Sequence, residues 1–101
     1  MKLPSMSTET RVRRVGVDLQ DSEDTRLLVE AMEADNPGLT VSQIPGIVKV
    51  QSTGEIVIRR RTVEEKVGRP WETHEFQLNI VSYSGNISDW DDDRIVIKWE
   101  H

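Results

Sequence analysis

The stretch DSEDTRLLVEAMEADNPG, residues 21–38, decides how the rest of the chain is interpreted. Asp21 or Ser22 can cap a helix here, and acidic residues in the next turn complement the positive end of its dipole. The Asn-Pro-Gly at 36–38 then stops the helix. Apolar residues recur at helical spacing opposite a strongly acidic face, so the stretch predicts a helix that packs on one side only.

Patterns typical of β-strands flank this helix on both sides. The expected strands cover residues 11–19, 39–44, 46–52, 55–61, 74–84 and 94–99. A second, short helix is expected from Thr62, which forms a capping box with Glu65, to a left-handed stop at Gly68. The order strand, helix, strand, strand therefore occurs twice. It predicts an α+β fold of duplicated β-α-β-β units, with antiparallel or mixed sheets and helices packed on one face.

Length and charge limit the class of protein. The chain has 101 residues, the size of one domain, which we expect over 11–101 after a flexible tail at 1–10. The net charge of −5 argues against nucleic acid and membranes as partners. There is no cysteine, and no apolar run approaches the roughly 20 residues that cross a bilayer. A cytoplasmic location is expected.

The stretch FQLNIVSYSGNISDWDDDRIVIKW, residues 76–99, contains an unusual strand end. The side chains expected to face the core are Phe76, Leu78 and Ile80. Ser82 and Ser84 continue the same alternation, ahead of Gly85 and a run of acidic residues. A catalytic serine, a metal loop or a docking surface would each account for this change from apolar to hydroxyl side chains.

Serine catalysis is the weakest of these three interpretations. A nucleophile elbow needs glycine two residues to either side of its serine, but Ser84 has Ser82 and Asn86 there. The histidines are His74 and His101, and neither has a spacing typical of a triad or a zinc site.

The acidic run supports a second alternative, a small acidic ligand-binding or calcium-binding module. The residues at positions one, three, five and twelve of an EF-hand loop are Asp89, Asp91, Asp93 and Glu100. Arg94 occupies the sixth position, where the loop requires glycine. No metal ligand or cofactor is predicted, and the acids are read as a turn between strands.

Two further groups of residues have an open interpretation. Arg59–Arg61 is the densest basic spot and is either a solvated strand end or a patch that binds acids. Trp99 alternates with apolar residues and is expected in the core. Trp71 and Trp90 lie beside turns and are either lids on the core or interface anchors. Apolar area near them suggests weak self-association as a hypothesis.

Four segments together resemble the cofactorless coupling, or effector, proteins of bacterial multicomponent di-iron monooxygenases. The segments are EAMEADNPG (30–38), EEKVGRPW (64–71), SYSGNI (82–87) and IKWEH (97–101). The likeness is greatest to the phenol hydroxylase branch and covers residues from about 15 to 101 in the family's order. The resemblance implies a non-catalytic regulatory protein with the duplicated β-α-β-β fold.

The resemblance also implies a partner and a role. Family members dock on the α-subunit of a hydroxylase near its di-iron site and couple NADH and dioxygen consumption to substrate hydroxylation. They compete functionally with the reductase component. The substrate belongs to the hydroxylase, which the sequence leaves open. The residues expected to contact the hydroxylase are Asn36, Pro37, Arg69, Trp71, Ser82, Ser84, Gly85 and Asn86.

Overall fold

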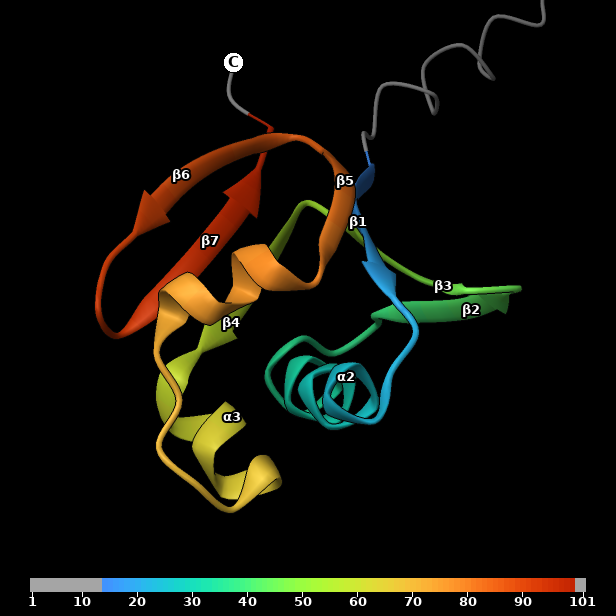
Figure 1. The fold of residues 1–101 in the computed structure, drawn as a ribbon. Helices are drawn as coiled ribbons and strands as arrows, with labels where there is room; N and C mark the ends of the chain where they lie inside the picture. The colour runs from blue at the N-terminus through green and yellow to red at the C-terminus, as the bar shows by residue number, and fades with distance from the viewer. Residues whose placement is uncertain (1–13, 100–101) are drawn as a thin grey trace, which may run out of the picture.

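The computed structural model describes residues 14–99 as a mixed α+β domain with two sheets (Figure 1). The strands are β1 (Arg14–Gln20), β2 (Thr40–Ile44), β3 (Ile47–Thr53), β4 (Glu55–Arg59), β5 (Ile80–Ser84), β6 (Asn86–Trp90) and β7 (Arg94–Lys98). The helices are α2 (Glu23–Asp35), α3 (Arg60–Val67) and the 3-10 helix η1 (Thr73–Leu78). The predicted tail at 1–10 lies outside the described residues.

The two halves of the chain pair their strands in the same way. In the first half β1 pairs with β3 and β3 with β2, and in the second half β4 pairs with β7 and β7 with β6. All these pairs are antiparallel, and each half has a helix directly after its first strand. The α2 helix contacts both α3 and β4, below the sheets in Figure 1. The predicted α+β class with duplicated units is therefore confirmed.

The strand β5 is the exception to this duplication. It follows η1 in the second half but pairs with β1, so it forms an edge of the first sheet, whose order is β2-β3-β1-β5. The second sheet has the order β4-β7-β6. The chain passes directly from β5 into β6 and so links the two sheets (Figure 1).

The predicted strand over 74–84 is wrong in its first half. Residues 73–78 form η1, because Glu72 and Glu75 make a reciprocal capping box in which the Glu75 carboxylate accepts the Glu72 N–H at 3.0 Å. A 3-10 helix has roughly three residues per turn, so alternate side chains no longer share a face. Phe76 is fully buried while Leu78 is 75 % exposed. The strand missed by sequence analysis is β6, which was read as loop.

The two α-helices begin differently. Ser22 caps α2 as predicted, since its Oγ accepts the N–H of Thr25 at 3.1 Å. The α3 helix begins two residues earlier than predicted, and Arg59 at its N-cap makes no side-chain capping bond. The predicted capping box from Thr62 to Glu65 is wrong because both residues already lie inside the helix.

One core joins both sheets and the helices. Buried side chains alternate along β1, β3 and β4, as expected for strands with one face toward the core. In β7, the central strand of the second sheet, Ile95, Val96 and Ile97 are all buried. The largest fully buried residues are Phe76, Leu19, Leu28, Met32, Ile56, Ile58, Ile95, Ile97, Val15, Val17, Val50 and Val63. No helix within residues 14–99 is long and apolar enough to cross a membrane.

Candidate partner-binding surface

The connection from α3 to β6, residues 68–85, is held to the body of the protein at its beginning. Gly68 ends α3 in the left-handed region, with φ of 76°. Trp71 is buried, and its backbone N–H donates to Glu64 Oε2 at 2.9 Å. This N–H and the guanidinium of Arg60, whose Nε lies 3.2 Å from the same oxygen, lower the pKa of Glu64. The segment therefore leaves α3 along a fixed path.

The η1 helix is fixed on its inner side and open on its outer side. The buried ring of Phe76 meets Trp90 edge to face, with ring centroids 6.1 Å apart. The hydroxyl of Thr73 donates to the carbonyl of Asp91 at 2.6 Å. Leu78, at the end of η1, is the most exposed large hydrophobic residue among those described.

The edge strand β5 continues this exposure. It pairs with β1, but the register shifts between Ile80 and Ser82, so Val81 is the extra residue of a bulge. Val81 is 51 % exposed and Tyr83 48 % exposed. Bulges on edge strands turn side chains outward and prevent a regular neighbouring strand from pairing. Leu78 and β5 therefore present apolar side chains at one edge of the first sheet.

Hydroxyl side chains lie on the other face of the same strand. Ser82 is paired with Asp18 and Ser84 with Gly16 in β1, on the face that points away from the core. The Ser82 hydroxyl donates to Asp18 Oδ2 at 3.0 Å, and Lys49 donates to Asp18 Oδ1 at 3.1 Å. Ser82 and Ser84 are two residues apart and therefore share a face of the strand, so this face carries short polar side chains.

We call the exposed residues at this edge the β5 surface. It consists of Leu78, Val81, Ser82, Tyr83, Ser84 and Asn86. The serines and Asn86 were predicted as contact residues, and they are exposed. Leu78, Val81 and Tyr83 were missed, because the sequence assigned Leu78 to the core and gave no weight to apolar residues between the serines. The Glu-x-x-Glu spacing of Glu72 and Glu75 was the signal that could have corrected the first error.

Gly85 has a structural role that accounts for its position. Its φ is 124°, a conformation that favours glycine. A Cβ here would lie 3.1 Å from Val15 Cγ1 and 3.2 Å from Ile97 Cγ2. The chain thus passes from one sheet to the other directly over the core. Gly85 is needed for this passage, whatever it contacts outside the protein.

Asn36 is also an internal residue. It is 6 % exposed, and its amide nitrogen donates to the carbonyls of Met32 and Val57, both at 2.7 Å. Its Oδ1 accepts the N–H of Val57 at 2.8 Å. The side chain therefore closes α2 and satisfies the free edge of β4 in place of a neighbouring strand. Both of its N–H groups are used and the side chain is buried, so it is not a contact residue, whereas the adjacent Pro37 is exposed.

The remaining predicted contact residues are one accessible side chain, Arg69, and one buried side chain, Trp71. Arg69 is partly exposed, but Glu75 Oε1 lies 3.4 Å and Asp24 Oδ2 4.0 Å from its guanidinium. Trp71 is 3 % exposed, and Trp90 packs against the core. Both tryptophans are therefore core lids, Trp71 fully buried and Trp90 half-buried.

The acidic run forms the hairpin turn between β6 and β7. Asp91 Oδ1 accepts the N–H groups of Asp93 at 2.8 Å and Arg94 at 2.9 Å, and these two bonds lower the pKa of Asp91. Arg94 pairs with Asp89 at 3.3 Å. Glu100 lies outside the described residues. Within residues 14–99, no three His, Cys, Asp or Glu side chains gather as metal ligands would, and the geometry is that of a turn.

These features define a small α+β protein with a candidate binding surface on one edge strand. A match to the MmoB/DmpM family model covers residues 13–98, and the chain belongs to this family. It is 37 % identical over 87 residues to the phenol 2-monooxygenase stimulatory component DmpM of Pseudomonas sp. (strain CF600), covering 86 % of this chain and 96 % of that protein. The resemblance drawn from the sequence is therefore confirmed.

Solved structures agree with this assignment. A chain in a phenol hydroxylase–regulatory protein complex has a TM-score of 0.82 and 38 % identity, covering 87 % of this chain and 100 % of that one. The soluble methane monooxygenase regulatory protein B has a TM-score of 0.68 at 19 % identity, covering 86 % of this chain and 65 % of that one. The second likeness supports the fold alone.

Proposed function

We propose that this chain is the regulatory component of a multicomponent phenol hydroxylase, and that it docks on the hydroxylase through the β5 surface. The observation that carries the role is the likeness, over 87 % of this chain, to a chain solved in a phenol hydroxylase–regulatory protein complex. The curated relative is likewise named a stimulatory component of a monooxygenase. The protein would bind no cofactor and perform no chemistry itself.

The β5 surface has the properties that such docking needs. Leu78, Val81 and Tyr83 offer exposed apolar area within one short segment, and exposed apolar patches favour an interface. The side chains of Ser84 and Asn86 make no hydrogen bond within residues 14–99, so their polar groups are available to a partner. Short side chains allow close approach to the helices of the hydroxylase α-subunit beside its di-iron site.

A regulatory role follows from binding alone. A partner that has different affinities for two states of the hydroxylase shifts the population between them and needs no reactive group. Docking beside the di-iron site would couple NADH and dioxygen consumption to hydroxylation. Functional competition with the reductase follows if both proteins use overlapping hydroxylase surface. Self-association through the β5 surface would oppose docking, and concentration-dependent sedimentation measures it.

The test is the amount of product formed per NADH consumed by a phenol hydroxylase and its reductase as this protein is titrated in. We expect coupling to rise to a maximum near one protein per hydroxylase active site and to fall in excess. A flat titration with a verified cognate hydroxylase would overturn the proposed role.

A pair of matched variants tests the surface. Val81→Lys and Ile44→Lys each place a lysine on an edge strand of the first sheet, at positions 51 % and 49 % exposed. Burying an unpaired ammonium in an interface is costly, so we expect Val81→Lys to weaken stimulation at least tenfold. Ile44→Lys should retain it. If Ile44→Lys weakened stimulation and Val81→Lys retained it, the docking surface would lie on β2 instead.

A further inference from the structure

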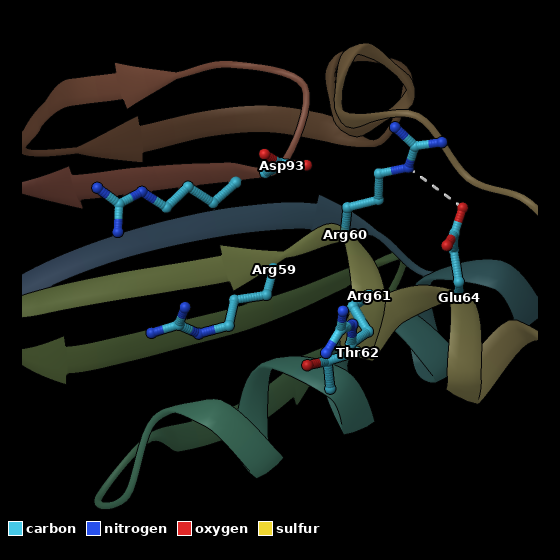
Figure 2. Close-up of a pocket in the computed structure, with 7 residues that line it drawn as sticks. Arg59, Arg60, Arg61, Thr62, Glu64 and Asp93 are labelled. Carbon is cyan, nitrogen blue, oxygen red and sulfur yellow. Dashed lines mark hydrogen bonds and ion pairs between the residues drawn. The ribbon is translucent and has the colours of Figure 1, made fainter.

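A groove of about 500 Å³ with an unusual concentration of arginines lies where β4 meets α3 (Figure 2). Its charged lining consists of Arg59, Arg60, Arg61, Arg94, Glu64 and Asp93. Four guanidinium groups thus outnumber two carboxylates, in a chain whose net charge is −5. The groove is therefore a positively charged site on a negatively charged protein.

Two of these arginines have no partner in the part of the chain described. Arg60 turns toward α3 and pairs with Glu64 at 3.2 Å (Figure 2), and Arg94 pairs with Asp89 at 3.3 Å. The guanidinium groups of Arg59 and Arg61 make no hydrogen bond or ion pair within residues 14–99, and both residues are exposed. In Figure 2, Arg59 extends away from Arg60, so the side of the groove opposite the Arg60–Glu64 pair carries unneutralised charge.

Two features of this arrangement are unfavourable for the fold. Arg59 lies directly opposite Arg94 in the β4–β7 pair, and like charges at such positions are destabilising. Arg60 and Arg61 lie in the first turn of α3, which has no acidic residue and no side-chain cap. Positive side chains oppose the helix dipole at this end. A bound anion would relieve both unfavourable contacts at once.

We propose that this groove binds an acidic segment of a protein partner, with side-chain carboxylates on Arg59 and Arg61. The fork of a guanidinium matches a carboxylate with two parallel hydrogen bonds. The carboxylate of Asp93, unpaired within residues 14–99, and the Thr62 hydroxyl can accept N–H groups, which a peptide has and a free phosphate lacks. The groove volume also suits a peptide segment better than a single small anion.

The groove is separate from the β5 surface. Asn86, which follows β5, pairs with Lys98 at one end of β7, while Arg59 pairs with Arg94 at the other. The four residue steps along β7 separate these ends by about 13 Å. The groove and the β5 surface therefore share no residue.

The test is a titration of N-acetylated, C-amidated hexaglutamate into the isotopically labelled full chain, followed by backbone amide shifts in nuclear magnetic resonance. We expect saturable shifts at residues 59–62 and 93–94 that weaken as salt increases. The double variant Arg59→Gln/Arg61→Gln should bind about tenfold more weakly or not at all. Lys66→Gln removes one charge from the exposed side of α3 outside the groove and should change affinity less than twofold.

Each result has a defined meaning. Equal binding by the wild type and the double variant would overturn the proposal, and so would inorganic phosphate binding as tightly as the peptide. Neither guanidinium has an internal partner and both are unfavourably placed, so the variant should keep or raise its thermal midpoint. Arg61→Ala provides a second test if the midpoint falls. Because no hydroxylase is present, a failed coupling experiment leaves this result unaffected.

Discussion

The two halves of the chain share a strand order but differ in the segment that follows each helix. In the first half α2 is joined to β2 by residues 36–39, and in the second half α3 is joined to β6 by residues 68–85. The longer segment contains η1 and β5, and with them most of the exposed apolar side chains described above. Duplication accounts for the scaffold, and the added segment accounts for the candidate surface.

The difference also shows how the added segment is anchored. Short connections are typical inside compact domains, and long ones are usually functional or poorly ordered. This long segment is ordered because Trp71, Phe76 and Gly85 fix its start, middle and end on the core. The residues between these anchors are free to face a partner. Predictions that separate anchors from surface residues test this comparison.

The largest effect is expected at the junction of the halves. Gly85→Ala adds a Cβ both at positive φ and within 3.2 Å of two core side chains, whereas Gly38→Ala meets positive φ with nothing within 4 Å. We expect Gly85→Ala to lower the free energy of unfolding by about 2–4 kcal/mol and Gly38→Ala by about 1 kcal/mol. Urea unfolding measures both. Equal losses would mean that Gly85 is not packed over the core.

The next effect concerns the internal bridge between the halves. Asn36→Ala leaves the N–H and carbonyl of Val57 without their side-chain partner. Loss of this bonding should cost about 2–3 kcal/mol, because unsatisfied buried backbone groups are costly. Asn86→Ala removes an exposed amide with no bond within the described chain and serves as the control. If Asn36→Ala left the free energy of unfolding unchanged, Asn36 would not have the internal role described here.

The helix starts should differ by a smaller amount. Ser22→Ala removes the N-cap of α2 and should cost about 1 kcal/mol. Thr62→Ala should change stability by less than about 0.5 kcal/mol, because Thr62 lies inside α3 and does not cap it. Thermal unfolding measures both losses of stability. If Thr62→Ala cost as much as Ser22→Ala, Thr62 would have the capping role that the sequence predicted.

The smallest effect is the pH dependence in the second half. The folded-state pKa values of Glu64 and Asp91 are lowered, by the Trp71 N–H and Arg60 and by the Asp93 and Arg94 N–H groups respectively. Their contribution is therefore present above the ordinary carboxylate pKa of about 4 and is lost as the pH falls through the lower folded values. Urea midpoints from pH 6 to pH 3 should fall less steeply for Glu64→Gln than for the wild type. An identical slope would contradict this assignment.

The sequence predicts more of the scaffold than of the surface, for physical reasons. Helical periodicity and the Ser22 cap are local signals, and they identify α2. Gly85 and Asn36 were noticed but interpreted as contacts, because their internal roles depend on Val15 and Val57, which are distant in sequence. Leu78 was assigned to the core because it alternates with Phe76 and Ile80 in the sequence. That assignment fails because residues 73–78 form a 3-10 helix instead of a strand. The exposure of Tyr83 depends on the edge position of β5, which only the sheet order reveals.

The most direct test of the account is amide hydrogen exchange of this protein, free and bound to a phenol hydroxylase. The outward N–H groups of β5 have no strand partner in the free protein, while β2 forms the opposite edge of the same sheet. We expect slower exchange over 78–86 in the complex and unchanged exchange over 40–44. Protection over 40–44 with none over 78–86 would contradict it.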